Sequence, residues 1–190
     1  MTAVLIILAV LVVLVGLIVV AVYNGLVRAR NKVDEGWSGI DVQLTRRHDL
    51  IPNLVESVKA YAAHERAALD SVLEARSRAV GAQQAGPAGA ATTAQAEASL
   101  TGAVRGLLAV AEAYPDLKAS NNFLQLQDEL SDTEDQVAAA RRIYNGNVQS
   151  YNSRIQTIPG NLIAGPFGFT PREFYEAEDP ATREPVRVSF

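Results

Sequence analysis

The 190-residue chain contains no cysteine, and it has only two histidines and one tryptophan. The absence of cysteine excludes a disulfide framework, a thiol nucleophile and a thiolate metal site, but it leaves the redox compartment open. Basic residues are not in excess either, because 17 Lys and Arg stand against 21 Asp and Glu, for a formal net charge of −4. Without a positive field to attract a nucleic acid, we do not expect nucleic-acid binding.

Motifs that carry chemistry are also missing. His48 and His64 do not have the i, i+4 spacing of metal ligands on a helix, and no HExxH sequence occurs. Ser38 lacks the frame of a nucleophile elbow, and the chain has neither a Walker A nor a GxGxxG sequence. The sequence therefore predicts no enzymatic activity, no catalytic residues, no cofactor and no metal.

A long apolar run opens the sequence. Every residue from 3 to 23 is apolar or aromatic except Gly16, and at about 1.5 Å per residue a helix of this length covers roughly the 30 Å hydrocarbon thickness of a bilayer. A cleaved secretory signal is the alternative. No charged region precedes the run, however, and its end lacks the small residues of a cleavage site. We expect residues 1–24 to form an uncleaved transmembrane anchor.

The residues after this run indicate its orientation. Tyr23 ends the run as an interfacial aromatic residue, and Arg28, Arg30 and Lys32 follow it, whereas two uncharged side chains precede it. The positive-inside rule then places the short N-terminus outside and the C-terminal domain in the cytoplasm. The same cations are close enough to the bilayer to contact anionic headgroups. We predict a single-pass protein of the inner or plasma membrane, with Tyr23 and the three cations at the membrane interface.

Residues 25–158 have the apolar periodicity of a helical bundle. One apolar stripe runs along a helix from residue 25 toward residue 79. Pro52 interrupts the pattern, and the sequence leaves open whether it kinks this helix or breaks it, so the bundle has three or four helices. Arg47 lies on the stripe, so we expect it either to snorkel toward solvent or to pair with an acidic residue across the interface. The stripe consists of Trp37, Ile40, Leu44, Ile51, Leu54, Val58 and Tyr61.

Two more helices are expected. Residues 81–89 hold three Gly and one Pro, which predicts a flexible turn before a helix over residues 91–114. A third helix begins near Leu117, and its acidic residues between 128 and 135 indicate a solvated face rather than a cation site. Its apolar positions recur every seven residues at Phe123, Leu130, Val137, Tyr144, Tyr151 and Ile158.

Residues 159–190 change character, because Gly and Pro end regular helix while the segment stays apolar. We expect this irregular aromatic segment to dock on the bundle surface, with the membrane face or another protein as alternatives. The alternation of Val186, Val188 and Phe190 with polar residues is typical of an extended strand that pairs with a partner. The candidate partner-binding residues are Phe167, Phe169, Phe174 and Tyr175.

Several motifs are spread over nearly the whole chain. They are RNKVDEGWSGIDVQL at 30–44, RRHDLIPNLV at 46–55, YAAHE at 61–65, YPDLKA at 114–119, YN at 144–145 and 151–152, and PREFY at 171–175. In these motifs the chain resembles the LemA family of bacterial membrane proteins. The resemblance implies a single-pass, N-terminally anchored protein with a helical-bundle domain, and it implies no reaction, cofactor or catalytic residue set. Relatives are associated with membrane organisation and with genes for membrane proteases, which implies a scaffold or adaptor.

The sequence thus predicts an all-α protein, in which a transmembrane helix continues into a bundle of three to four long helices and ends in an irregular segment. Two functions fit. The first is a membrane-tethered scaffold that holds protein partners or copies of itself at the cytoplasmic face. The second is direct action on the lipid bilayer through the anchor and the aromatic C-terminal segment.

Overall fold

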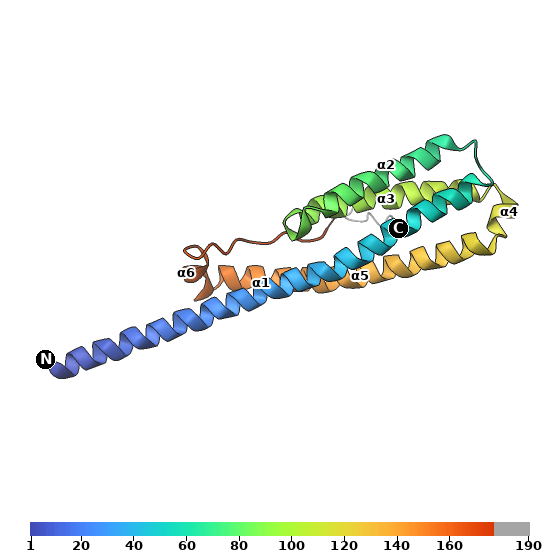
Figure 1. The fold of residues 1–190 in the computed structure, drawn as a ribbon. Helices are drawn as coiled ribbons and strands as arrows, with labels where there is room; N and C mark the ends of the chain where they lie inside the picture. The colour runs from blue at the N-terminus through green and yellow to red at the C-terminus, as the bar shows by residue number, and fades with distance from the viewer. Residues whose placement is uncertain (177–190) are drawn as a thin grey trace, which may run out of the picture.

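The structure, a computed structural model, describes residues 1–176 (Figure 1). The predicted all-α fold is confirmed, because the described residues form helices and no β-strand. The expected strand at Val186, Val188 and Phe190 lies outside the described residues. The elements are α1 (Thr2–Lys59), α2 (Arg66–Gln83), the 3-10 helix η1 (Gly86–Gly89), α3 (Ala90–Ala111), α4 (Pro115–Lys118), α5 (Asn121–Gln156) and α6 (Gly160–Ala164).

Four long helices make up the bundle. The second half of α1 lies along α5, and α2 packs along α3 and against α1 (Figure 1). The short α4 closes the end of the bundle that is far from the N-terminus. The short α6 lies where α1 enters the bundle, which we call the membrane end (Figure 1).

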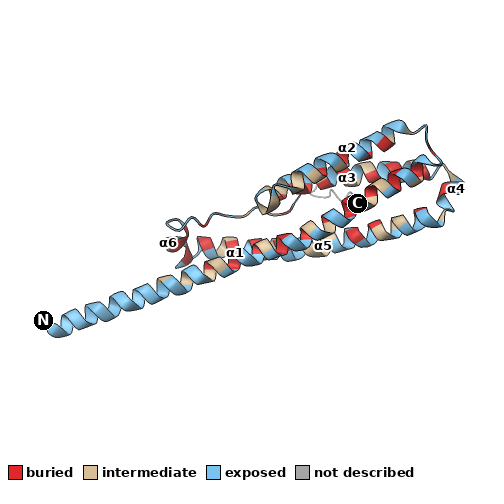
Figure 2. Ribbon diagram, viewed as in Figure 1, coloured by how far each residue is buried: buried red, intermediate tan, exposed pale blue. Residues whose placement is uncertain are grey.

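The first part of α1 projects from the bundle, and its apolar side chains are exposed (Figure 2). α1 is the only helix of the described chain that is long and apolar enough to cross a membrane, and none of its most apolar stretch is buried. The apolar run is therefore not the core helix of a soluble domain. Its helix continues without interruption into the bundle, so the apolar stretch and the first bundle helix form one rod of 58 residues, about 87 Å long.

Pro52 lies inside α1 and does not break it, since the helix continues to Lys59. A proline has no N–H group, so the carbonyl oxygen of His48, four residues earlier, loses its usual helical donor. Arg76 of α2 replaces that donor, because its Nε atom donates a hydrogen bond to the His48 oxygen at 2.7 Å. The neighbouring helix thus compensates for the proline, and the apolar stripe stays in phase through Pro52.

The expectation that the first helix extends to residue 79 is wrong. The chain turns between Lys59 and Arg66, and Tyr61, which was placed on the stripe, is exposed in this turn. Neither Gly nor Pro occurs at residues 60–65, so no local signal marks the turn. The turn reverses the chain, so Leu69 and Val72 of α2 are buried in the same cluster as residues of α3. In a straight helix, Leu69 and Val72 would have no apolar partner.

Replacing Arg76 with methionine should lower the free energy of unfolding by about 1–3 kcal/mol, because the His48 carbonyl would be left without a donor. Pro52→Ala restores a helical N–H, so in that background Arg76→Met should cost much less. Thermal unfolding of the full chain in detergent, followed by circular dichroism, measures both costs. An equal loss in the two backgrounds would show that Arg76 does not act through this carbonyl.

Two further expectations need correction. The region 81–89 is shorter and more regular than a flexible turn: α2 reaches Gln83, and η1 begins at Gly86, whose φ of 63° lets the chain reverse. Ile158, the last member of the predicted apolar repeat in α5, is exposed beyond the end of that helix. The helix ends at Gln156 because Pro159 follows closely.

The core divides into two apolar clusters along the bundle. The membrane-proximal core joins α1, the start of α3, α5, α6 and the segment after it. The distal core joins the end of α1 to α2, the rest of α3, α4 and the start of α5. Main members of the membrane-proximal core are Leu26, Val33, Trp37, Ile40, Leu44, Tyr144, Val148, Tyr151, Ile163, Phe169 and Tyr175. Main members of the distal core are Ile51, Leu54, Val58, Val72, Leu100, Leu107, Leu117, Phe123 and Leu130.

The segment after α6 lies in an extended conformation along α5. Asn152 accepts a hydrogen bond from the backbone N–H of Arg172 at 2.9 Å and donates one to its carbonyl oxygen at 2.9 Å. Asn145 bonds the N–H and the carbonyl oxygen of Tyr175 in the same way. Seven helical residues rise about 10.5 Å and three extended residues span about 10 Å, so the spacing of the asparagines matches the spacing of their partners.

The tyrosines that precede these asparagines show the same agreement between a seven-residue spacing in α5 and a three-residue spacing in the extended segment. Tyr144 donates to the carbonyl oxygen of Glu173 and Tyr151 to that of Thr170, each at 2.9 Å. The two YN motifs therefore bind the backbone of residues 170–175. Burial raises the pKa of Tyr144 to about 12 and raises the pKa of Tyr151 as well, so both hydroxyls keep their protons and remain donors near neutral pH.

Candidate functional site at the membrane end of the bundle

An aromatic cluster surrounds the point where α1 enters the bundle. The ring of Tyr23 lies 5.2 Å from that of Phe167 and 5.6 Å from that of Phe169. The guanidinium group of Arg30 lies over the Phe169 ring at 5.4 Å, which is cation–π geometry. After α5 the chain turns back toward α1, and Gly160 allows this turn because a side chain there would collide with the carbonyl oxygen of Arg154. The cluster thus ties the apolar helix to the bundle.

Large apolar side chains are also exposed beside this cluster. Ile158 is 79% exposed, Leu162 69% and Phe167 55%. All three belong to α6 or the turns that flank it, at the membrane end (Figure 1). Burying such side chains against lipid or protein would be favourable, since each full burial contributes about 1.5–3 kcal/mol.

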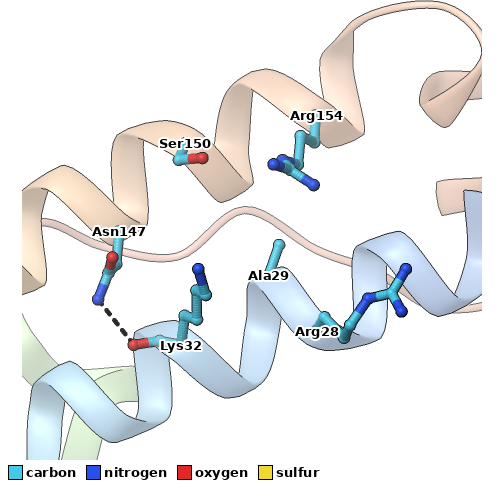
Figure 3. Close-up of a pocket in the computed structure, with 6 residues that line it drawn as sticks. All are labelled: Arg28, Ala29, Lys32, Asn147, Ser150 and Arg154. Carbon is cyan, nitrogen blue, oxygen red and sulfur yellow. Dashed lines mark hydrogen bonds between the residues drawn. The ribbon is translucent and has the colours of Figure 1, made fainter.

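A cavity of about 270 Å³ lies between α1 and α5 at the same end. In Figure 3 the Lys32 side chain rises from α1 and the Arg154 side chain comes down from α5 toward the gap above Ala29. Arg28 extends along α1 toward its N-terminal side. Asn147 is anchored, because its Nδ2 donates to the carbonyl oxygen of Lys32 at 2.8 Å. The lining residues are Arg28, Ala29, Lys32, Asn147, Ser150 and Arg154, and none of them is acidic.

A second groove of about 340 Å³, lined mainly by apolar residues, lies beside this cavity on the side of the apolar helix. Arg154 lines both spaces, so its side chain lies between them. The groove is otherwise lined by Ala21, Val22, Gly25, Leu26, Thr157, Ile158, Pro159 and Gly160. A cationic cavity therefore lies beside an apolar groove that leads toward the membrane segment.

The four residues predicted at the membrane interface lie within three turns of α1, but they do not share one role. Tyr23 and Arg30 contact the aromatic cluster, whereas Arg28 and Lys32 line the cationic cavity. They are positioned by the helix that carries the apolar run into the bundle.

The four candidate partner-binding aromatics also divide. Phe167 is exposed and Phe174 half-buried, while Phe169 and Tyr175 are buried in the membrane-proximal core. Trp37 packs against Tyr175, with 6.1 Å between ring centroids. In this structure a partner can therefore reach Phe167, whereas Phe169 and Tyr175 stabilise the docked segment.

Sequence reasoning missed the α5 side of the cavity. Asn147, Ser150 and Arg154 lie more than 110 residues after Arg28 and fall outside the motifs quoted above. Their i, i+3, i+7 spacing, which puts them on one helix face, is the signal that could have grouped them. That signal does not identify which helix faces them.

A layer of polar side chains, the polar layer, separates the two apolar cores. Glu97 of α3 accepts hydrogen bonds from Arg47 at 3.0 Å and from His48 Nε2 at 2.6 Å. Arg47 also donates to Thr101 at 2.7 Å and to Glu134 of α5 at 3.1 Å. The expected pairing of Arg47 across the interface is confirmed. Because every link is a structural hydrogen bond inside the bundle, we assign the layer a role in packing.

A helical bundle joined to one exposed apolar helix defines a class, namely a membrane-associated helical-bundle protein. The sequence profile of the LemA family matches residues 36–190. The chain therefore belongs to the LemA family, and the resemblance based on its motifs is confirmed.

Similar proteins carry two names. Magnetosome protein MamQ 2 of Paramagnetospirillum magneticum is 26% identical over 185 residues, and the match covers 86% of this chain and 68% of that protein. Magnetosome protein MamQ of Magnetospirillum gryphiswaldense is 28% identical with the same coverage. Protein LemA of Metamycoplasma hominis is 30% identical over 141 residues, which cover 74% of this chain and 63% of that protein. None of these names denotes an enzymatic activity.

Proposed function

We propose that this protein is a membrane-anchored, non-catalytic scaffold that holds protein partners or further copies of itself at the membrane surface. The observation that carries the proposal is the unbroken α1 helix, which joins an exposed apolar segment to the core of a bundle. A rigid connection fixes the position of the bundle relative to the bilayer, which suits a scaffold. The positive-inside rule, applied to Arg28, Arg30 and Lys32, favours the cytoplasmic side.

An exposed groove on the bundle supports protein contact. Ile143 of α5 is 64% exposed and borders a groove of about 410 Å³ that also contains the exposed Gly39 of α1 and Ala140 of α5. Small residues let another helix approach closely, and an exposed Ile at the rim gains from burial. This surface suits a helix of a second copy or of a partner.

A second candidate function is direct action on the bilayer, and the exposed apolar side chains of the membrane end favour it. Ile158, Leu162 and Phe167 lie next to the anchor, where a lipid surface can receive them. The two functions differ in what contacts each surface, so one experiment separates them.

A photo-reactive amino acid placed at Ile143 in intact membranes should form adducts with protein, because the groove beside it receives a helix. Placed at Phe167, it should label lipid if the membrane end acts on the bilayer. Gel mobility and mass spectrometry of the purified adducts identify the products. A matched control places the same group at Glu74, an exposed position of α2 whose side chain forms an ion pair with Arg78.

Protein adducts from Ile143 but not from Glu74 would support the scaffold. Uncross-linked monomer at both positions would contradict it. Protease digestion of sealed, right-side-out vesicles that carry a C-terminally tagged chain determines the orientation. Removal of the tag by protease added outside the vesicles would contradict the cytoplasmic placement.

A further inference from the structure

We infer that the cationic cavity and the apolar groove beside it form a binding site for one anionic phospholipid, with the phosphate between Lys32 and Arg154 and an acyl chain along the groove. The inference rests on the membrane-anchored arrangement proposed above, because the site needs a bilayer at this end of the bundle. It adds a ligand class that a scaffold does not require.

The charges of the cavity are complementary to a phosphate. Three cations, Arg28, Lys32 and Arg154, line it without any carboxylate. Within residues 1–176 none of the three forms an ion pair or donates a side-chain hydrogen bond. By contrast, Arg47 has acidic partners and Arg30 has an aromatic ring. Unneutralised cations that converge from two helices favour an anion between them.

The polar groups beside these cations complete the arrangement. Ser150 presents an exposed hydroxyl in the cavity wall, and Asn147 uses its Nδ2 on the Lys32 carbonyl, which fixes the wall. Lysine and arginine bind phosphate oxygens by charge-assisted hydrogen bonds, and serine adds a neutral one. The chemistry therefore fits a phosphodiester.

The location selects a lipid rather than a soluble anion. The α1 cations of the cavity, Arg28 and Lys32, lie five and nine residues after Tyr23, about 7.5 and 13.5 Å along the helix axis. The headgroup region of each leaflet is about 5–8 Å thick, so Arg28 lies at its outer limit and the long side chain of Lys32 can reach back to it. The groove that continues from Arg154 toward Ala21 and Val22 is largely apolar. A free phosphate ion would leave this groove unfilled, whereas the acyl chain of a phospholipid would fill it.

The test uses the full chain in nanodiscs of phosphatidylcholine that contain phosphatidylglycerol. Native mass spectrometry after release into detergent counts the retained lipids, and titration gives the affinity. We expect one retained phosphatidylglycerol per chain, and about a fivefold loss of affinity for each of Arg28→Gln, Lys32→Gln and Arg154→Gln. These side chains are exposed, so the variants should fold, and circular dichroism checks this.

Matched variants separate a defined site from general attraction. Arg30→Gln removes a charge at the same depth but outside the cavity, so it should not change retention. Ser150→Leu fills the cavity from an exposed position with all cations kept, and Gly25→Leu fills the groove at a position where a side chain meets nothing. Both should reduce retention.

Three results would overturn the inference. Equal losses for Arg30→Gln and the cavity variants would show diffuse electrostatics. Unchanged retention in Ser150→Leu and Gly25→Leu would show that neither space holds lipid. Binding of inorganic phosphate to the lipid-free chain, with phosphatidylglycerol not retained, would assign the cavity to a soluble anion. Photo-cross-linking from Ile143 in the same variants tests the scaffold separately, so the two proposals can fail independently.

Discussion

Replacing Glu97 with alanine is expected to lower the free energy of unfolding by about 3–5 kcal/mol. Glu97 is buried and accepts hydrogen bonds from both Arg47 and His48. Without it Arg47 keeps only Glu134, whose side chain is 46% exposed, as its acidic partner. A buried guanidinium that loses its main partner is far less favourable than the original pair. Chemical unfolding of the full chain in detergent, followed by circular dichroism, measures the loss.

Two comparisons show whether burial of the charge is the cause. Glu74→Ala removes the exposed ion pair with Arg78 and should cost less than about 1 kcal/mol. Combining Glu97→Leu with Arg47→Met removes both charges together, so the double variant should recover much of the stability lost by Glu97→Ala. A double variant that is less stable than Glu97→Ala would contradict the argument.

The polar layer has a structural consequence beyond its stability. It lies between Leu44 and Ile51 on α1 and between Ala94 and Leu100 on α3, where the membrane-proximal core gives way to the distal core. Sliding α3 along α1 by one turn would place Glu97 opposite an apolar neighbour and bury charges without partners. The layer therefore specifies one register for the helices, as isolated polar residues do in coiled coils.

Periodicity predicted the elements whose burial depends on one helix alone. Trp37, Ile40, Leu44, Ile51, Leu54 and Val58 are all buried, because residues on one face of α1 meet α5 and α2 whatever the connections between helices are. In α5, Phe123, Leu130, Tyr144 and Tyr151 are buried for the same reason, while Val137 is half-buried. The apolar run was equally predictable, because its length as a helix matches the hydrocarbon thickness of a bilayer.

Features that depend on contacts between two distant segments could not be predicted from the sequence. The pairing of Arg47 was predicted, but its partner Glu97 lies 50 residues away and is selected by how α3 packs. The turn at residues 60–65 has no local signal, since only the burial of α2 against α3 requires it. The cationic cavity was not predicted: Arg28 and Lys32 were expected at the membrane interface because they follow the apolar run, and Arg154 joins them only when α5 returns to the membrane end.

The sequence shows the repeat of the two YN motifs but not the role of these residues. A seven-residue repeat of Tyr and Asn in α5 is compatible with simple packing. Its second role depends on the extended conformation of residues 170–175, whose carbonyl groups recur at a matching distance. Helical and extended segments cannot be aligned from the sequence until their relative direction is known.

Replacing Trp37 with alanine is expected to cost about 3–5 kcal/mol, as for other buried aromatic residues. Trp37 is only 6% exposed, and its ring lies 5.6 Å from that of Tyr144 in edge-to-face geometry. It also packs against Tyr175, so its loss removes a wall of the site where residues 170–175 dock. Thermal unfolding by circular dichroism measures the stability, and trypsin cleavage after Arg172 measures the docking.

A distal-core variant tells a local effect from a global one. Leu107→Ala should cost about 2–5 kcal/mol, but Leu107 lies in the distal core, away from the docked segment. We therefore expect fast cleavage after Arg172 in Trp37→Ala and slow cleavage in Leu107→Ala at a temperature where both remain folded. Equal cleavage in the two variants would mean that docking follows overall stability. In that case the aromatic contact of Trp37 with Tyr175 would not be what holds the C-terminal segment on the bundle.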